Sequence, residues 1–90
     1  MTSDSGDELL EFPCEFPLKI MGRALPGFDT HVRTIVDRHV PPQDQLAFVP
    51  RASQQGRYIS LTVTIRASSR AQLDDLYRAL SADERILVVL

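Results

Sequence analysis

Residues 57–67 read RYISLTVTIRA and alternate apolar and polar side chains along their length. Successive side chains of an extended chain point to opposite sides, so this segment has one apolar face and one polar face. The pattern predicts a β-strand with one face on a hydrophobic core and a hydroxyl-rich face towards water or a partner. The apolar face would carry Ile59, Leu61, Val63, Ile65 and Ala67, and the other face Tyr58, Ser60, Thr62, Thr64 and Arg66.

A helical stripe precedes this strand in the sequence. Apolar side chains recur at helical spacing from Phe28 onwards, which predicts a helix over residues 26–39. Pro26 suits a first helical turn, where its missing N–H would be unpaired, and Pro41 with Pro42 would end the helix because neither donates a hydrogen bond. The stripe consists of Phe28, Val32, Ile35, Val36 and His39.

A second helix is expected directly after the strand. Ser69 and Gln72 have the spacing of a capping box, in which the two side chains pair with backbone N–H groups at the start of a helix. The apolar positions that follow predict a helix over residues 70–82. Its buried side would carry Leu73, Leu76, Tyr77 and Leu80.

Three further segments have strand character. Residues 16–22, FPLKIMG, alternate and end at a glycine, whereas residues 45–51, QLAFVPR, contain Pro50, which restricts them to the edge of a sheet. The segment 85–90, RILVVL, has no polar side chain after its arginine. We expect it to form a strand at the other edge, with neither proline nor inward charge to protect that edge.

The resulting order, βαββαβ, predicts an α+β fold of the ferredoxin-like type. With right-handed crossovers it gives a four-stranded antiparallel sheet of order 4-1-3-2 and two helices on one face. We expect residues 9–90 to form this single domain. Residues 9–16, LLEFPCEF, would be a turn or 3₁₀ segment that tucks aromatic side chains onto it, and residues 1–8 would be a disordered acidic tail.

Charge is unevenly distributed along the 90 residues, although the net charge is only −2. Residues 1–15 contain five acids and no base, whereas residues 16–90 contain ten bases and seven acids. Nine of the ten bases are arginine, whose planar guanidinium pairs with carboxylate and phosphate in two-pronged fashion. A mildly basic folded body permits an anionic ligand without requiring one.

Composition argues against several classes of protein. No stretch approaches the roughly 18 apolar residues of a membrane span, and the acidic N-terminus differs from a signal peptide. The single cysteine, Cys14, cannot form an internal disulfide, and His31 and His39 are too far from it in sequence for zinc-type spacing. We expect a cytoplasmic protein with no metal, cofactor or membrane partner.

The sequence resembles the YbeD family of small bacterial proteins of unknown function. The resemblance is carried by LLEFPCEFPLKIMG (9–22), ALPGF, RHVP, SQQGRYISLTVTIRA, LYRAL and the final VVL, and it covers residues 9–90. It implies a ferredoxin-like fold similar to ACT-type regulatory domains, which dimerise and bind small effectors such as amino acids near the first strand–helix loop. Leu25 stands where many ACT loops have an acidic residue or asparagine.

The loop GRALPG, residues 22–27, is the candidate ligand site. N–H groups at the start of the helix would face a carboxylate or amino-acid effector, and Arg23 would pair with its carboxylate. Gly22, Arg23, Pro26 and Gly27 are the residues of this hypothesis. The alternative is that the same residue types form only a tight turn and a helix start.

The apolar C-terminal strand is a candidate interface, formed by Ile86, Leu87, Val88, Val89 and Leu90. In one interpretation, the helices cover one face of this strand and LLEFP folds beneath the sheet to cover the other. In the second interpretation, the strand pairs or packs with a second copy of the chain or with another protein.

The leading functional hypothesis is a non-enzymatic regulatory domain, and a protein-interaction adaptor without a ligand is the alternative. RNA-recognition domains share the βαββαβ order, but the comparable stretch here, GRYISLTV, offers only Tyr58 as a stacking aromatic and the first strand presents Lys19 and Met21, so nucleic acid is a weaker candidate. Catalysis has no motif to support it, since Cys14 lacks a neighbouring base. His39 is expected at a helix C-terminus and His31 on a solvated helix face.

Overall fold

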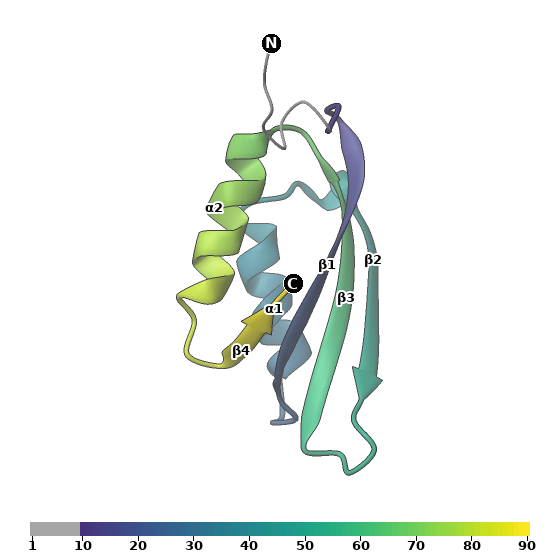
Figure 1. Cartoon of the computed structure of the whole chain (residues 1–90), viewed down its shortest axis with the longest axis vertical. Coiled ribbons are helices and arrows are strands. Elements are labelled where there is room, and N and C mark those ends of the chain that lie inside the picture. The colour runs from purple at the N-terminus through teal and green to yellow at the C-terminus, as the bar shows by residue number, and fades with distance from the viewer. Residues whose placement is uncertain (1–9) are drawn as a thin grey trace.

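The structure of the chain is a computed structural model that describes residues 10–90 (Figure 1). The expected acidic tail over residues 1–8 therefore lies outside the described residues, as does Leu9. The described elements are β1 (Cys14–Arg23), α1 (Phe28–Asp37), the 3₁₀ turn η2 (Pro42–Asp44), β2 (Gln45–Ala52), β3 (Tyr58–Ala67), α2 (Arg70–Ser81) and β4 (Ile86–Val89).

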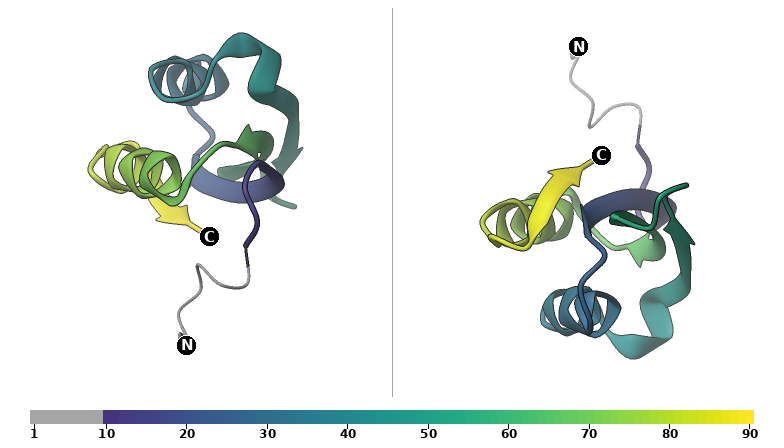
Figure 2. Two further views of the ribbon diagram at one scale, coloured as in Figure 1. Left: turned by 90° about the horizontal axis from the view of Figure 1, so that it is seen from above. Right: turned by 90° about the horizontal axis from the view of Figure 1, so that it is seen from below.

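The four strands form one antiparallel sheet in the order β2-β3-β1-β4, and the predicted ferredoxin-like fold is confirmed. Figure 2 looks along the long axis and shows α1 and α2 on the same side of the sheet. The other side, called the open face below, has no helix over it. Pro50 lies in the edge strand β2, as predicted.

The core lies between the sheet and the two helices. The predicted apolar face of β3 is confirmed, because Leu61, Val63, Ile65 and Ala67 are all buried while Tyr58 and Arg66 on the other face are exposed. The core is completed by Leu18, Ile20, Phe28, Val32, Ile35, Val36, Val40, Leu73, Leu76, Leu80 and Ile86.

The first strand is longer than its sequence pattern indicates. Residues 9–16 were expected as a turn or 3₁₀ segment, but β1 begins at Cys14, which pairs with Ala67 of β3. Phe16 pairs with Ile65 in the same register. Pro13 and Pro17 flank residues 14–16 and interrupt the alternating pattern that would indicate a strand in the sequence. Pairing with the long strand β3 nevertheless keeps these residues extended.

Both helices begin and end close to the predicted positions. Helix α1 is shorter than the predicted 26–39, because Gly27 adopts φ 79° at its N-cap and Arg38 is its C-cap. The predicted capping at α2 is confirmed: the Gln72 N–H donates to Ser69 Oγ at 3.1 Å. Gln72 Nε2 also donates to the His39 carbonyl oxygen at 2.9 Å, which joins α2 to the segment after α1.

A bulge explains why β4 does not alternate. Val88 pairs with Met21 and Ile86 with Gly22, so Leu87 is an extra residue opposite the β1 step between Met21 and Gly22. Ile86 is buried, whereas both Leu87 and Val88 are exposed. Beyond the strand, the Leu90 N–H donates to the Lys19 carbonyl oxygen at 2.8 Å, and the Lys19 N–H returns a bond of 3.0 Å.

The segment that precedes β1 does not cover the outer side of β4. Leu10 lines a hollow with Phe16, Leu73 and Tyr77, on the side of the sheet that carries α2. Phe12 packs against the core. The interpretation that LLEFP folds beneath the open face is therefore wrong for residues 10–13. Their apolar side chains lie on the side of the sheet that carries α2.

Candidate anion-binding site

The site is built where two connections meet at one end of the sheet. The Ala24 N–H, in the loop between β1 and α1, donates to the Arg57 carbonyl oxygen at 2.8 Å, in the hairpin between β2 and β3. The hairpin turn is closed by a bond of 3.0 Å from the Gly56 N–H to the Ser53 carbonyl oxygen, and Gly56 has φ 72°. Glycine suits this turn because other residues rarely adopt positive φ.

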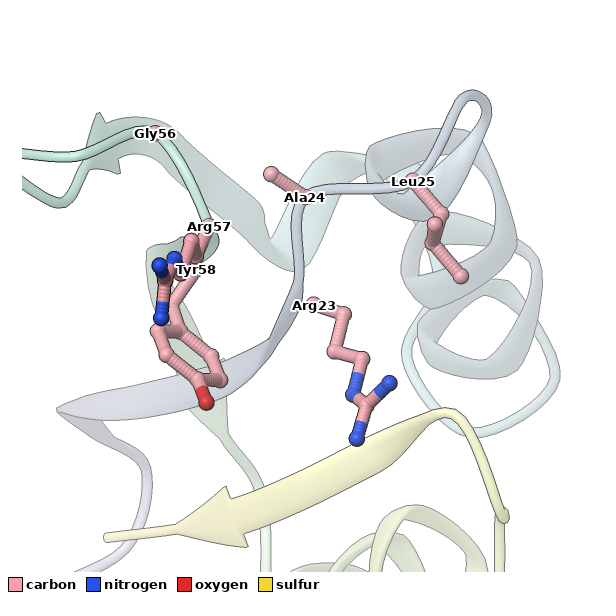
Figure 3. A pocket seen from close by; sticks show the side chains of 6 residues that line it. All are labelled: Arg23, Ala24, Leu25, Gly56, Arg57 and Tyr58. Carbon is pink, nitrogen blue, oxygen red and sulfur yellow. The ribbon is translucent and has the colours of Figure 1, made fainter.

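A hollow of about 400 Å³ lies between these two connections (Figure 3). We call it the arginine hollow. Figure 3 shows Arg57 and Tyr58 on the hairpin side and Arg23 at the end of β1 with its side chain directed towards β4, so cationic side chains line the hollow from two different elements. Its lining consists of Arg23, Ala24, Leu25, Gly56, Arg57 and Tyr58.

The arginine hollow has a strongly positive lining. Arg23 and Tyr58 stand directly opposite each other in the β1–β3 register, and Arg57 precedes Tyr58. Within the part of the chain that the structure describes, no aspartate or glutamate lines the hollow and neither guanidinium forms an ion pair. Two guanidinium groups without a carboxylate partner, beside a phenolic hydroxyl, can bind a carboxylate or phosphate.

The structure separates the four residues of the predicted loop site. Arg23 lines the arginine hollow, but Gly22 is buried behind it. A Cβ at Gly22 would overlap the Phe28 ring and lie 2.6 Å from the Arg85 carbonyl oxygen, so this glycine permits close packing. Pro26 and Gly27 are exposed and do not line the hollow.

Sequence reasoning missed the hairpin half of this site. Arg57 and Tyr58 are more than thirty residues from Arg23 in the chain. Only the pairing of β1 with β3 brings them together. The turn SQQG has no local sequence feature that indicates which loop it will contact. The predicted strand order makes β1 and β3 neighbours, but it does not set the register that places Arg23 opposite Tyr58.

The predicted interface residues differ in accessibility. Ile86 is in the core and Val89 is half-buried against it. Leu87, Val88 and Leu90 are 53%, 41% and 66% exposed. The accessible part of this candidate interface is therefore these three side chains.

Of the two histidines, only His31 has surroundings different from those expected. His31 is not a solvated helix residue: it is half-buried, and its Nε2 lies 2.7 Å from Asp83 Oδ2 in the turn before β4. His39 follows the C-cap of α1, and its backbone N–H donates to the Val36 carbonyl oxygen at 2.9 Å, so it lies at the helix C-terminus as expected. The Asp83–His31 contact brings α1 against the α2–β4 turn.

Asp83 is held as a carboxylate by its neighbours. Burial raises the pKa of the Asp83 carboxyl, but the Arg85 backbone N–H, the His31 side chain and the nearby positive charges together lower it more. Its pKa therefore lies below the ordinary value. The Arg85 N–H donates to Asp83 Oδ1 at 2.9 Å.

Other chemistry finds little support in the described part of the chain. Within residues 10–90, no group of three or more His, Cys, Asp or Glu side chains is arranged to hold a metal ion. Cys14 is a free, half-buried thiol. No helix among these residues is long and apolar enough to cross a membrane.

Solved structures of other proteins share this fold. The chain is similar to the ACT domain from GTP pyrophosphokinase of Chlorobium tepidum, with a TM-score of 0.68 and 13% identity, over 84% of this chain and 94% of that one. It is also similar to protein HP0495 from H. pylori, with a TM-score of 0.74 and 15% identity, over 100% and 94% of the two chains. At these identities the similarity shows the fold alone.

Sequence relatives match over nearly the full length. A UPF0250 protein of Nitrosomonas europaea is 44% identical over 90 residues, which is 100% of both chains. A UPF0250 protein of Paraburkholderia phytofirmans is 46% identical over 88 residues, 98% of this chain and 99% of the relative. Residues 7–90 match the family model described as "Protein of unknown function (DUF493)", which confirms the resemblance to YbeD-type proteins. The chain belongs to this DUF493 family of bacterial proteins with an ACT-like fold.

Proposed function

We propose that this chain is a non-enzymatic regulatory domain that binds a small carboxylate effector in the arginine hollow. The observation that carries the proposal is that Arg23, at the end of β1, and Arg57, in the β2–β3 hairpin, line one hollow to which the described residues contribute no acidic side chain. Of the predicted loop site, Arg23 keeps its proposed role of pairing with the carboxylate. The pairing partner on the other side is Arg57 rather than the start of α1.

The fold supports a regulatory role. One structure with this fold is an ACT domain of an enzyme, and the ACT resemblance implies effector binding near the first strand–helix loop. The arginine hollow lies at that loop, between β1 and α1. A chain with one half-buried free thiol also suits the reducing cytoplasm, where we place its action.

The test is an amide chemical-shift titration of the uniformly ¹⁵N-labelled chain. Short carboxylic acids and amino acids are added one at a time, at constant pH and ionic strength. We expect saturable shifts confined to residues 22–28 and 56–58. If no compound in the panel moves these amides, the proposal fails.

Arg57→Gln and Arg66→Gln provide a matched pair of variants for the same titration. Both arginines are exposed and come from the same strand region, but Arg66 lies at the opposite end of β3 and does not line the hollow. A charge-assisted hydrogen bond contributes about 1.5–3 kcal/mol, so Arg57→Gln should weaken carboxylate binding roughly 10- to 100-fold. Arg66→Gln should leave the affinity unchanged within error.

Association through β4 is a second candidate function. The exposed apolar side chains of Leu87, Val88 and Leu90 favour contact with a second copy of the chain. Three side chains are few beside the roughly 20–30 residues per side of a standard interface, so anion binding ranks first. Sedimentation of the parent chain and of Val88→Asp tests this candidate: a dimer that the aspartate dissociates supports it, and a monomeric parent rejects it.

A further inference from the structure

A second hollow, of about 180 Å³, borders the arginine hollow at Tyr58, which lines both. We call it the outer hollow. It lies at the open face, since Met21, Ser60 and Arg51 are cross-strand neighbours on that side of the sheet. Its lining consists of Met21, Arg51, Ala52, Ser53, Tyr58, Ile59 and Ser60.

The sheet register fixes how far apart the cations of the two hollows stand. Arg23 pairs with Tyr58, and Arg51 pairs with Ser60 on the opposite side of β3. With about 3.3 Å per residue along a strand and about 4.8 Å between strands, the Cα atoms of Arg23 and Arg51 lie roughly 12 Å apart. Because both side chains are long, they can hold two anionic groups of one small molecule.

The surface between the two cationic ends is apolar in part. Tyr58 is 44% exposed and Met21 is half-buried, and both side chains line the outer hollow. An aromatic ring and a thioether suit contact with a hydrocarbon spacer better than contact with a charged group. The ligand that fits therefore has charge at its ends and an apolar middle.

The lining discriminates against an ammonium group. Among residues 10–90, no aspartate or glutamate lines either hollow, while Arg23, Arg57 and Arg51 supply three positive charges. The ammonium of an amino acid would have no counter-charge and would be repelled by these guanidiniums. A ligand that carries two carboxylates and no ammonium has a partner for each charge.

We propose that the ligand is an elongated dicarboxylate without an ammonium group. One carboxylate pairs with Arg23 and Arg57, the other pairs with Arg51, and the spacer lies over Tyr58 and Met21. This inference rests on the proposed function, because it adds a second subsite to the arginine hollow.

The test is isothermal titration calorimetry at fixed ionic strength with matched ligands. Straight-chain dicarboxylates from succinate to suberate are compared with monocarboxylates of the same chain length, and glutarate is compared with glutamate, which differs by its ammonium group. We expect the best dicarboxylate to bind at least about tenfold more tightly than its monocarboxylate, as one further charge-assisted pair allows. Glutarate should bind more tightly than glutamate.

Arg51→Gln separates the second subsite from the first. In this variant the ratio of dicarboxylate affinity to monocarboxylate affinity should fall to about one, because the second carboxylate has lost its partner. Arg66→Gln, on the same face but outside both hollows, should keep the parent ratio. Amide spectra of both variants show that the fold is retained.

The outcomes distinguish this inference from the proposed function. If monocarboxylates bind but dicarboxylates bind no more tightly, or if Arg51→Gln keeps the parent ratio, the dicarboxylate inference is overturned and the carboxylate site stands. Tighter binding of glutamate than of glutarate also overturns it. If no carboxylate of either kind binds, the inference and the proposed function both fail.

Discussion

The two faces of the sheet have opposite chemistry although they alternate along the same strands. On the helix side, β3 contributes Leu61, Val63, Ile65 and Ala67, none of which is more than 1% exposed. On the open face, the register places Lys19, Arg23, Arg51 and Arg66, with Glu15 as the single acid that the strands contribute there. This comparison indicates that burial of apolar side chains against the helices stabilises the fold, whereas the charged side chains of the open face are not needed for stability.

Removal of a core side chain should have the largest effect on stability. Leu76 of α2 is fully buried, so Leu76→Ala should lower the free energy of unfolding by about 2–5 kcal/mol, as cavities in packed cores do. Leu87→Ala, at an exposed position of β4, is the matched control and should cost less than about 1 kcal/mol. Urea denaturation measures both variants. Equal losses would contradict the contrast between buried and exposed apolar positions.

Gly22→Ala tests whether Gly22 serves packing or binding. The new methyl group would meet the Phe28 ring and the Arg85 carbonyl oxygen, so we expect a loss of about 1–3 kcal/mol from overpacking. Gly56→Ala is the comparison: it has open space but φ 72°, and strain alone should cost about 1 kcal/mol. Thermal unfolding ranks the two variants. A stable Gly22→Ala chain would show that the close approach at Gly22 tolerates a side chain.

Asp83→Asn should lower stability at neutral pH by about 1 kcal/mol, because it removes a carboxylate that accepts from the Arg85 N–H and contacts His31. The folded pKa of Asp83 lies below its unfolded value, so its contribution is present above pH of about 4 and is lost as the pH falls through the folded pKa. Unfolding measured from neutral to acidic pH should show parent and variant converge. A constant difference down to the lowest pH would contradict this role.

The contact between Arg33 and the Phe48 ring should have the smallest effect. The guanidinium carbon lies 4.0 Å from the ring centroid, and exposed cation–π pairs contribute about 0.5–1 kcal/mol. A double-mutant cycle with Arg33→Ala and Phe48→Leu isolates the coupling from the loss of each side chain. A coupling of zero would show that the contact between Arg33 and the Phe48 ring does not contribute to stability.

The fold could be predicted from sequence because its elements have strong local patterns. The strict alternation of residues 57–67 and the helical stripe from Phe28 correspond to β3 and α1, and Pro50 marks an edge strand. The start of β1 at Cys14 could not be seen, because extension there is imposed by pairing with β3. The bulge at Leu87 could not be predicted either, because an all-apolar segment has no alternation that an extra residue would interrupt.

Only the Arg23 side of the candidate site could be predicted from the sequence. Arg23 was found from the strand–loop–helix pattern around it. Arg57 and Arg51 join it only through the order and register of the sheet, and neither has a local motif. The sequence makes Gly22 and Gly27 candidate ligand-binding residues, because a glycine needed for packing or for positive φ looks the same in sequence as one needed for ligand approach.

The most direct test of the central claim measures stability and binding in the same protein. The double variant Arg23→Gln/Arg57→Gln removes both cations of the arginine hollow, and urea unfolding and carboxylate titration are then compared with those of the parent chain. We expect the free energy of unfolding to change by less than about 0.5 kcal/mol while carboxylate binding is lost. Unchanged carboxylate affinity, or a loss of stability comparable to that of Leu76→Ala, would contradict the division of roles between the two faces.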